Sequence, residues 1–203
     1  GMSAGAALVD HTTASQQLAV ELASACTAAG VSFLDAPVSG GQAGAENAAL
    51  TVMLGGSESD YQKIRPLLDV YAKKTALMGP VGAGQLTKMV NQICIAGVLQ
   101  GLAEGVHFAH VAGLDVDAVV DVISQGAAQS WQMNNRAATM AQDTYDFGFA
   151  VDWMRKDLGI ALDTGRELNA RLPMTALVDQ FYADVQSMGG GRWDTSSLLR
   201  RLT

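Results

Sequence analysis

Charged residues, basic side chains and cysteine are all scarce in this sequence. Only 16% of its 203 residues are charged, against about a quarter in an average globular protein, whereas 49% are hydrophobic. This composition excludes a disordered chain and supplies enough apolar material for a sizeable core. The 13 lysine and arginine residues are outnumbered by 20 acidic ones, and the net charge of −7 repels phosphate backbones and anionic lipids. We therefore expect neither a nucleic-acid nor a membrane partner.

Membrane spans, secretion signals and metal motifs are also lacking. The longest uncharged apolar stretch, residues 89–103, includes the amides of Asn91 and Gln92 and is shorter than the roughly 20 residues that a span needs. The first residues have neither a basic start nor a long apolar run, so we expect a cytoplasmic protein. The two cysteines, Cys26 and Cys94, fall in helical patterns without nearby metal-ligand spacing, and they predict no disulfide and no metal site.

The order of elements predicts an α/β region followed by an all-α region. Aliphatic runs alternate with helical patterns over the first 80 residues, which is typical of parallel strands joined by crossover helices. After Gly84 every segment has helical periodicity. We predict an α/β layer with a parallel sheet over residues 1–82 and a C-terminal helical domain over residues 83–203. The expected strands are 7–10, 31–34, 50–54 and 75–78, and the expected helices are 15–29, 60–71, 85–112, 115–124, 130–143, 152–168, 173–188 and a short one from 195.

Polar caps and small residues punctuate the helical part. Asp115 and Asp152 are expected to cap the N-termini of two helices. Gly97, Gly101 and Gly105 recur every fourth residue of the long helix and form a strip without side chains along one face. Such a strip lets another helix approach closely, so we expect a homodimer or a higher homo-oligomer.

A glycine-rich segment, residues 79–84, leads into the long helix and brings a lysine with it. Lys88 lies about one turn inside the helix, and Asn91 and Gln92 share its face, so one amine and two amides can converge on one site. Most helical lysines are solvated, but this helix is apolar on nearly every side, which places Lys88 in a cleft with reduced solvation. Desolvation lowers the pKa of a lysine from about 10.4, so that Lys88 can exchange protons near neutral pH.

Two further clusters have polar residues that chemistry could use. Residues 35–45 follow a strand, and their glycines leave backbone N–H groups accessible beside the Ser39 hydroxyl. This segment predicts either a cradle for a carboxylate or phosphate oxygen or an ordinary glycine-rich turn, and the spacing favours neither. In residues 149–159 two cations lie beside two acids near a helix start, which indicates a surface ion-pair network.

Taken together, these motifs resemble the β-hydroxyacid dehydrogenase family, which includes 3-hydroxyisobutyrate dehydrogenase and tartronate semialdehyde reductase. The resemblance covers nearly the whole chain and implies NAD(P)-dependent oxidation of a small 3-hydroxy carboxylic acid by hydride transfer. It implies Lys88 as general acid/base and Asn91 as the residue that orients the substrate, although the order of Asn91 and Gln92 leaves the orienting amide open between them. It further implies substrate contacts from Ser39, Gly40, Gly41, Gln92 and Trp131, and cofactor contacts from Thr12, Lys156 and Asp157, with Asp157 holding Lys156.

The dinucleotide-binding turn of that family is missing from these residues. The family resembles a Rossmann domain whose first turn reads Gly-x-Gly-x-x-Gly, whereas the only similar pattern here, Gly82-x-Gly84, has Thr87 in the third position. We therefore expect the N-terminal half of the Rossmann domain to be absent and the strand at residues 7–10 to lie at an exposed sheet edge. The resemblance still implies NAD or NADP as the cofactor. The sequence does not distinguish between the two, because the residue that selects one of them is expected in the missing half.

Two hypotheses follow. In the first, the chain is a truncated oxidoreductase with impaired cofactor binding. In the second, it is a non-catalytic oligomerising module that retains only the substrate-site residues. A 6-phosphogluconate-type enzyme is a weaker alternative, because the helical part is short and offers no basic cluster for a substrate phosphate.

Overall fold

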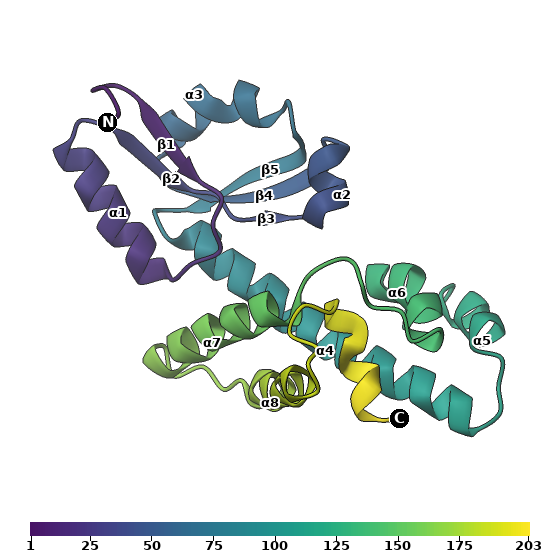
Figure 1. The fold of residues 1–203 in the computed structure, drawn as a ribbon. Helices are drawn as coiled ribbons and strands as arrows, with labels where there is room; N and C mark the ends of the chain where they lie inside the picture. Colours follow the sequence, from purple (N-terminus) through teal and green to yellow (C-terminus); the bar gives the residue numbers. More distant parts are fainter. The chain divides into compact units, whose positions relative to one another are not determined.

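The computed structural model describes all 203 residues in two compact units, residues 1–91 and 92–203. The first unit contains a five-stranded sheet, and the second contains helices with one isolated β-bridge (Figure 1). The predicted α/β region followed by a helical region is thus confirmed. The domain boundary after residue 82 stays a prediction.

The sheet of the first unit is mixed. Its strands are β1 (Ala7–Asp10), β2 (Ser32–Asp35), β3 (Val38–Ser39), β4 (Leu50–Gly55) and β5 (Ala72–Gly79). β1 pairs with β2 and β4 pairs with β5 in parallel, as predicted, but β2 and β3 both run antiparallel to β4. The expectation of parallel pairing throughout is therefore wrong. β1 lies at an edge of the sheet, as expected.

The length of one connection explains the reversal of β4. β3 was not predicted, and it continues the direction of β2 along the same neighbour, since Asp35 pairs with Gly55 and Val38 with Val52. Only the short helix α2 (Gly41–Glu46) separates β3 from β4. A parallel return needs a crossover of a dozen residues or more, so this short connection gives an antiparallel pair.

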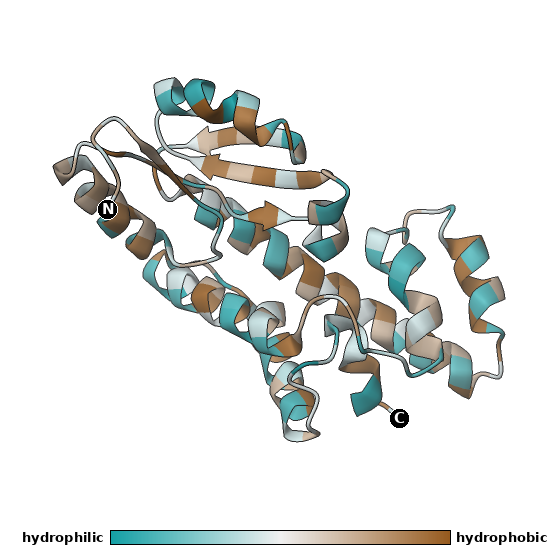
Figure 2. Ribbon diagram, turned by 45° about the horizontal axis from the view of Figure 1, so that its top comes forward, coloured by the Kyte–Doolittle hydropathy of each residue, from teal (hydrophilic) through white to brown (hydrophobic).

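Two helices flank the sheet on opposite sides in Figure 1, α1 (Gln16–Ala28) and α3 (Glu58–Leu68). Each begins at a serine cap: the Ser15 hydroxyl accepts from the N–H of Leu18, and the Ser57 hydroxyl from that of Asp60. The strands carry the apolar residues, as the brown segments of the sheet in Figure 2 show. The core of this unit includes Leu34, Val52, Leu54, Tyr61, Ile64 and Leu68.

The long helix α4 (Ala83–Val111) begins in the first unit and continues into the second. It is long and apolar enough to cross a membrane by length and composition alone, although 39% of its most apolar window is buried inside the protein. The core helix of a globular protein passes the same test. The expectation that no membrane is a partner stays a prediction.

The second unit is built from five further helices that pack in pairs. α7 packs against α8, α5 against α6, and the 3-10 helix η1 against α8 and α6. Their shared core includes Leu99, Met140, Met154, Leu158, Tyr182 and Leu198. The helices span α5 (Val116–Ile123), α6 (Trp131–Ala141), α7 (Val151–Glu167), α8 (Pro173–Ser187) and η1 (Thr195–Arg201).

One of the two predicted aspartate caps is correct. Asp115 caps α5 by accepting from the N–H groups of Asp117 and Ala118. Asp152 does not cap α7, because the cap residue is Ala150 and the side chain of Asp152 accepts from Gln186 instead.

Candidate active site

The amine of Lys88 is buried beside the glycine-rich loop of the first unit. Lys88 is 7% exposed, and its Nζ donates to the carbonyl oxygen of Val38 at 2.9 Å. Ser39 follows Val38 directly, so the amine lies next to the segment in which the substrate contacts are expected. A buried ammonium is costly unless it is hydrogen-bonded, and the carbonyl supplies one such bond. The structure therefore brings Lys88 to this loop and out of bulk water, and its catalytic role stays a prediction.

The loop itself has a specific backbone shape. Gly40 and Gly41 have φ values of 131° and 59°, and both lie in the region that favours glycine. A Cβ atom at Gly40 would lie 3.2 Å from the Leu50 side chain, so this position is also crowded. Both glycines are exposed at the surface, whereas Ser39 is partly buried in β3. A strand, two glycines with positive φ and a short helix thus replace the ordinary turn that was one of the two expectations.

A buried carboxylate accepts hydrogen bonds from backbone N–H groups at the start of α4. Asp35 is fully buried at the end of β2, and its two side-chain oxygens accept from the N–H of Gly82 at 2.7 Å and of Gln85 at 2.9 Å. A helix N-terminus with free N–H groups is a phosphate site. Here the carboxylate already takes that place, so the segment containing Gly82 and Gly84 does not offer a pyrophosphate cradle.

A glutamine on α4 holds the segment that contains the expected cofactor residue Thr12. The side chain of Gln85 is buried and donates to the carbonyl of Thr12. The N–H of Thr12 donates to Asp10 at 3.0 Å, and the residue is exposed. The backbone at Thr12 is thus fixed on both sides while its side chain faces solvent.

The histidine before Thr12 is held in one tautomer. His11 Nδ1 lies 2.6 Å from the carbonyl oxygen of Ala36, and Nε2 lies 2.8 Å from the hydroxyl of Tyr71. A carbonyl only accepts, so in the neutral ring Nδ1 carries the proton and Nε2 accepts from the hydroxyl. Burial raises the pKa of Tyr71, which keeps that hydroxyl protonated. No individual role was predicted for Asp35, Gln85 or His11, because a single polar residue beside an apolar run does not reveal whether it is buried.

In the second unit a buried carboxylate links two expected site residues. Asp157 is buried, and one of its oxygens accepts from the Gln92 amide nitrogen at 2.6 Å. Its other oxygen lies 3.0 Å from Nζ of Lys156, whose side chain is about half exposed. The expected contact between Asp157 and Lys156 is present, and the cofactor role of both stays a prediction. Asn91 precedes Gln92 on α4 and is partly buried.

The two cations near the start of α7 do not form the expected i,i+4 surface network, because Lys156 pairs with the adjacent Asp157 and Arg155 pairs with another helix. Arg155 pairs with Asp179 of α8, at 3.1 Å, and donates to Gln186 of the same helix. Gln186 in turn donates to Asp152. These contacts join α7 to α8, so they are structural.

Trp131, an expected substrate contact, is the first residue of α6 and is 59% exposed. The guanidinium of Arg136 lies 5.0 Å from the centre of its ring and 4.8 Å from that of Phe147. Arg136 also pairs with the buried Asp194 at 3.1 Å. The indole is therefore held by a cation–π contact, and its place in a substrate pocket stays a prediction.

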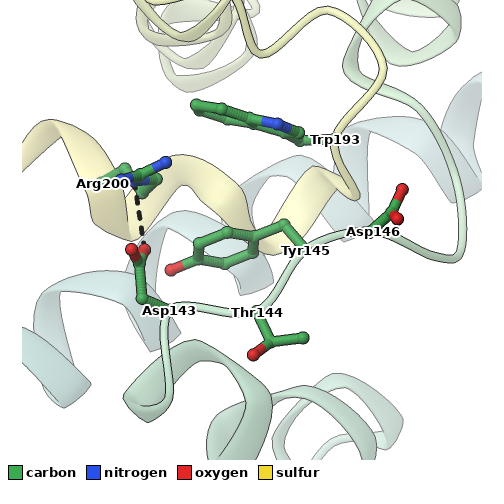
Figure 3. A pocket seen from close by; sticks show the side chains of 6 residues that line it. All are labelled: Asp143, Thr144, Tyr145, Asp146, Trp193 and Arg200. Carbon is green, nitrogen blue, oxygen red and sulfur yellow. Dashed lines mark ion pairs between the residues drawn. The ribbon is translucent and has the colours of Figure 1, made fainter.

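A cavity of about 300 Å³ in the second unit contains none of the expected site residues (Figure 3). Desolvation raises the pKa of Tyr145 to about 12, with a further contribution from Asp143. Arg200 pairs with Asp143 at 3.1 Å and stacks on Trp193. Two aspartates against one arginine disfavour a carboxylate ligand, and a tyrosine protonated at neutral pH is not a base. The lining residues are Asp143, Thr144, Tyr145, Asp146, Trp193 and Arg200.

Metal-ligand clusters and disulfides are absent from the structure. No three histidine, cysteine or acidic side chains lie close enough to hold a metal ion, and Cys26 and Cys94 are both free.

Comparisons with known proteins agree along the whole chain. Residues 1–79 match the family model described as the NAD binding domain of 6-phosphogluconate dehydrogenase, and residues 82–202 match that described as NAD-binding of NADP-dependent 3-hydroxyisobutyrate dehydrogenase. An uncharacterized oxidoreductase of Shewanella frigidimarina is 66% identical over 202 residues, which are 100% of this chain and 69% of that protein. A probable 3-hydroxyisobutyrate dehydrogenase-like protein of Arabidopsis thaliana is 39% identical, and the match covers 100% of this chain and 60% of that protein.

A solved structure is similar in fold as well as in sequence. The crystal structure of 3-hydroxyisobutyrate dehydrogenase from Salmonella typhimurium superposes with a TM-score of 0.90 at 34% identity, covering 98% of this chain and 70% of that one. The chain thus spans between 60% and 70% of the length of these relatives.

Proposed function

The chain belongs to the β-hydroxyacid dehydrogenase family, and from this membership we propose that it acts in the NAD(P)-dependent oxidation of a small 3-hydroxy carboxylic acid, with Lys88 as the general acid/base. The observation that carries the proposal is the buried Lys88 amine, which lies 2.9 Å from the carbonyl oxygen of Val38, the residue directly before Ser39, Gly40 and Gly41 in the chain. An amine and a carboxylate-binding loop side by side match a substrate that carries a hydroxyl and a carboxylate on neighbouring carbons.

The proposed reaction gives each residue of the loop one task. The Ser39 hydroxyl and the backbone N–H groups of Gly40 and Gly41 bind the substrate carboxylate. The neutral amine of Lys88 accepts the proton of the substrate hydroxyl as the carbonyl forms, and the product is an aldehyde acid. A bound nicotinamide would supply the acceptor for the hydride that leaves the alcohol carbon. In the reverse direction the ammonium of Lys88 returns the proton.

Of the two amide side chains on α4, we favour Asn91 as the one that orients the substrate. The Gln92 amide nitrogen donates to Asp157, so Gln92 orients the carboxylate that pairs with Lys156. We assign the orientation of the substrate hydroxyl to Asn91, one turn along α4 from Lys88, and keep Gln92 as a secondary substrate contact.

The residues present fit one end of a dinucleotide better than the other. In the second unit Lys156 is held by Asp157 with half of its side chain in solvent, so it would reach the nicotinamide end. In the first unit Thr12 is exposed on a fixed backbone and would lie against the cofactor. The pyrophosphate has no such place, because Asp35 occupies the N–H groups at the start of α4 and these residues contain no Gly-x-Gly-x-x-Gly turn. We infer that the 203-residue chain alone binds NAD or NADP weakly.

We also propose a cytoplasmic homo-oligomer. Gly101 and Gly105 lie at the surface of α4 with nothing within 4 Å of a Cβ atom there, and the large side chains of Phe108 and Val111 on the same helix are more than two-thirds exposed. Sedimentation equilibrium of the native protein tests the assembly, and Gly101→Glu should lower the molar mass if α4 forms the interface.

The function is tested with the native protein, NAD or NADP, and a panel of 3-hydroxy carboxylic acids that includes 3-hydroxyisobutyrate. Reduced nicotinamide should accumulate, and Lys88→Met should lower kcat about 10² to 10⁴-fold, the usual contribution of a general acid/base. The matched control is Lys73→Met, because Lys73 is exposed on β5. Equal activity of Lys88→Met and the control would refute the proposed role.

The non-catalytic alternative has its own signature. If the chain is an oligomerising module, calorimetry should detect no NAD or NADP binding while a small 3-hydroxy acid still binds. Dinucleotide binding to the native protein together with turnover would exclude that module.

A further inference from the structure

Two buried polar side chains at the start of α4 have no task in the proposed reaction. Asp35 is 0% exposed and Gln85 is 1% exposed. Neither side chain binds the substrate or moves a proton in the proposed reaction. Burying polar groups is unfavourable unless they are hydrogen-bonded, so their retention requires a compensating set of bonds. Both make such bonds, and every partner is a backbone group: the N–H groups of Gly82 and Gln85 for Asp35, and groups of Thr12 and Ala14 for Gln85.

Asp35 fixes the first turn of α4. Its carboxylate accepts from the N–H of Gly82 and of Gln85, at 2.7 and 2.9 Å, although it is 47 and 50 residues distant in sequence. The approach is close: a Cβ atom at Gly84 would lie 2.8 Å from Oδ2 and 2.9 Å from the carbonyl oxygen of Asp35. No side chain fits between the carboxylate and the helix at this position, so the glycine is what allows Asp35 to approach the first turn of α4 this closely.

Gln85 fixes the same turn to a different segment. Its Oε1 accepts from the N–H of Ala14 at 3.0 Å, and its Nε2 donates to the carbonyl of Thr12 at 2.7 Å. Both bonds reach the segment that connects β1 to α1 and contains the expected cofactor residue. Lys88 lies three residues after Gln85, so the two share one turn of the helix.

We propose that Asp35 and Gln85 are positioning residues that lock the Lys88 turn of α4 between the end of β2 and the Thr12 segment. This inference rests on the proposed function. The two residues set the place of the Lys88 amine against the Val38 carbonyl, and Gln85 makes that place depend on the conformation of residues 12–14. A lysine displaced by about 1 Å from its reacting geometry is expected to lose about 10²-fold in rate.

The test compares Gln85→Met and Asp35→Asn with matched controls in the native protein. Gln85→Met removes both bonds at nearly constant volume, and its control is Gln100→Met, because Gln100 is equally buried on the same helix. Asp35→Asn replaces one acceptor by a donor, and its control is Asp115→Asn, because the Asp115 carboxylate also accepts from two backbone N–H groups at a helix start but is exposed and far from Lys88 in sequence.

Both positioning variants should lower kcat about 10- to 100-fold while KM for the hydroxy acid changes less than about threefold. The limb of the pH–rate profile that reports the general base should move to lower pH, because the displaced ammonium loses its carbonyl acceptor. A purely structural role would lower the amount of folded protein but leave kcat per folded molecule and the pH profile unchanged. The inference would be overturned if Gln85→Met and Gln100→Met had the same kcat per folded molecule and the same pH profile.

A second measurement separates this inference from the proposed function. If the wild-type protein has no hydroxy-acid dehydrogenase activity, the proposed function fails, and amide hydrogen exchange then decides about the positioning residues. Asp35→Asn should accelerate exchange of the Gly82 and Gln85 amides about tenfold, and Gln85→Met should accelerate that of Ala14 and shift the NMR signal of the Lys88 amine. Unchanged exchange and an unchanged Lys88 signal would refute the lock.

Discussion

Replacing Asp194 by alanine should strongly destabilise the second unit. Asp194 is 1% exposed and accepts from four donors: Nε of Arg136, the N–H of Phe149, and the N–H and hydroxyl of Ser196. These donors belong to α6, to the segment before α7 and to η1, so one carboxylate joins three parts of the chain. Loss of a buried charge partner costs about 3–5 kcal/mol, because the guanidinium and the backbone donors stay buried without their acceptor. A domain of this size is stable by only about 5–15 kcal/mol.

The assay is urea unfolding followed by circular dichroism and tryptophan fluorescence, analysed by linear extrapolation. The control is Asp163→Ala, because Asp163 pairs with Arg166 on the exposed side of α7 with more than 70% of both side chains in solvent. Such a pair contributes about 0–1 kcal/mol, so the control should unfold nearly as the wild type does. A loss below about 1 kcal/mol for Asp194→Ala, with an unchanged m-value, would refute the assignment of Asp194 as the link between these segments.

Three shorter predictions concern titration and the proposed site. Desolvation raises the pKa of Tyr145 from 10.0 to about 12, so between these values the folded protein binds more protons than the unfolded chain, and the free energy of unfolding should fall by about 2 kcal/mol as the pH rises. Tyr145→Phe should flatten that decline in urea titrations at several pH values. Ser39→Ala should raise KM for the hydroxy acid about tenfold with little change in kcat, because it removes one hydrogen bond to a carboxylate, and steady-state kinetics will measure both. Lys156→Met should raise Kd for the nicotinamide cofactor about tenfold in a fluorescence titration, and an unchanged Kd would remove Lys156 from the cofactor site.

Local signals located most of the helices and strands. The strand at residues 7–10 has both predicted bounds, and the helix predicted from Pro173 begins at that residue. Serine caps place the starts of other helices close to the predicted positions. Hydrophobic periodicity, a cap and a glycine act within a few residues of one another, so they can be read from sequence alone.

The direction of β4 could not be read in this way. Residues 50–54 are apolar enough for a buried strand, but periodicity carries no information on parallel or antiparallel pairing. β3 has only two residues, Val38–Ser39, and α2 has six, so neither gives a periodic signal. The prediction that Asp152 caps α7 was wrong because distant contacts determine how this helix begins. The N–H groups of Val151 and Asp152 donate to the carbonyls of Trp193 and Gly191, about 40 residues later in the chain.

The candidate site divides along the same line. Lys88 and the loop at Ser39 could be predicted because each stands in a glycine-rich motif that resembles a family pattern. Their contact through the Val38 carbonyl could not be predicted, since it joins residues 50 positions apart. The roles of Asp35 and Gln85 could not be predicted, because burial is a property of the folded chain.

In each unit a glycine lies close to a buried carboxylate. A Cβ atom at Gly84 would contact the Asp35 carboxylate, and one at Gly148 would overlap Oδ2 of Asp194. In each unit a carboxylate that accepts several backbone N–H groups approaches the chain where a side chain is missing. The glycines of residues 79–84 therefore have a different meaning from the phosphate-binding turn that they resemble: they admit an anion that the protein itself supplies. Gly84→Ala should accordingly weaken the hold on Lys88 as Asp35→Asn does, with the same fall in kcat at nearly constant KM.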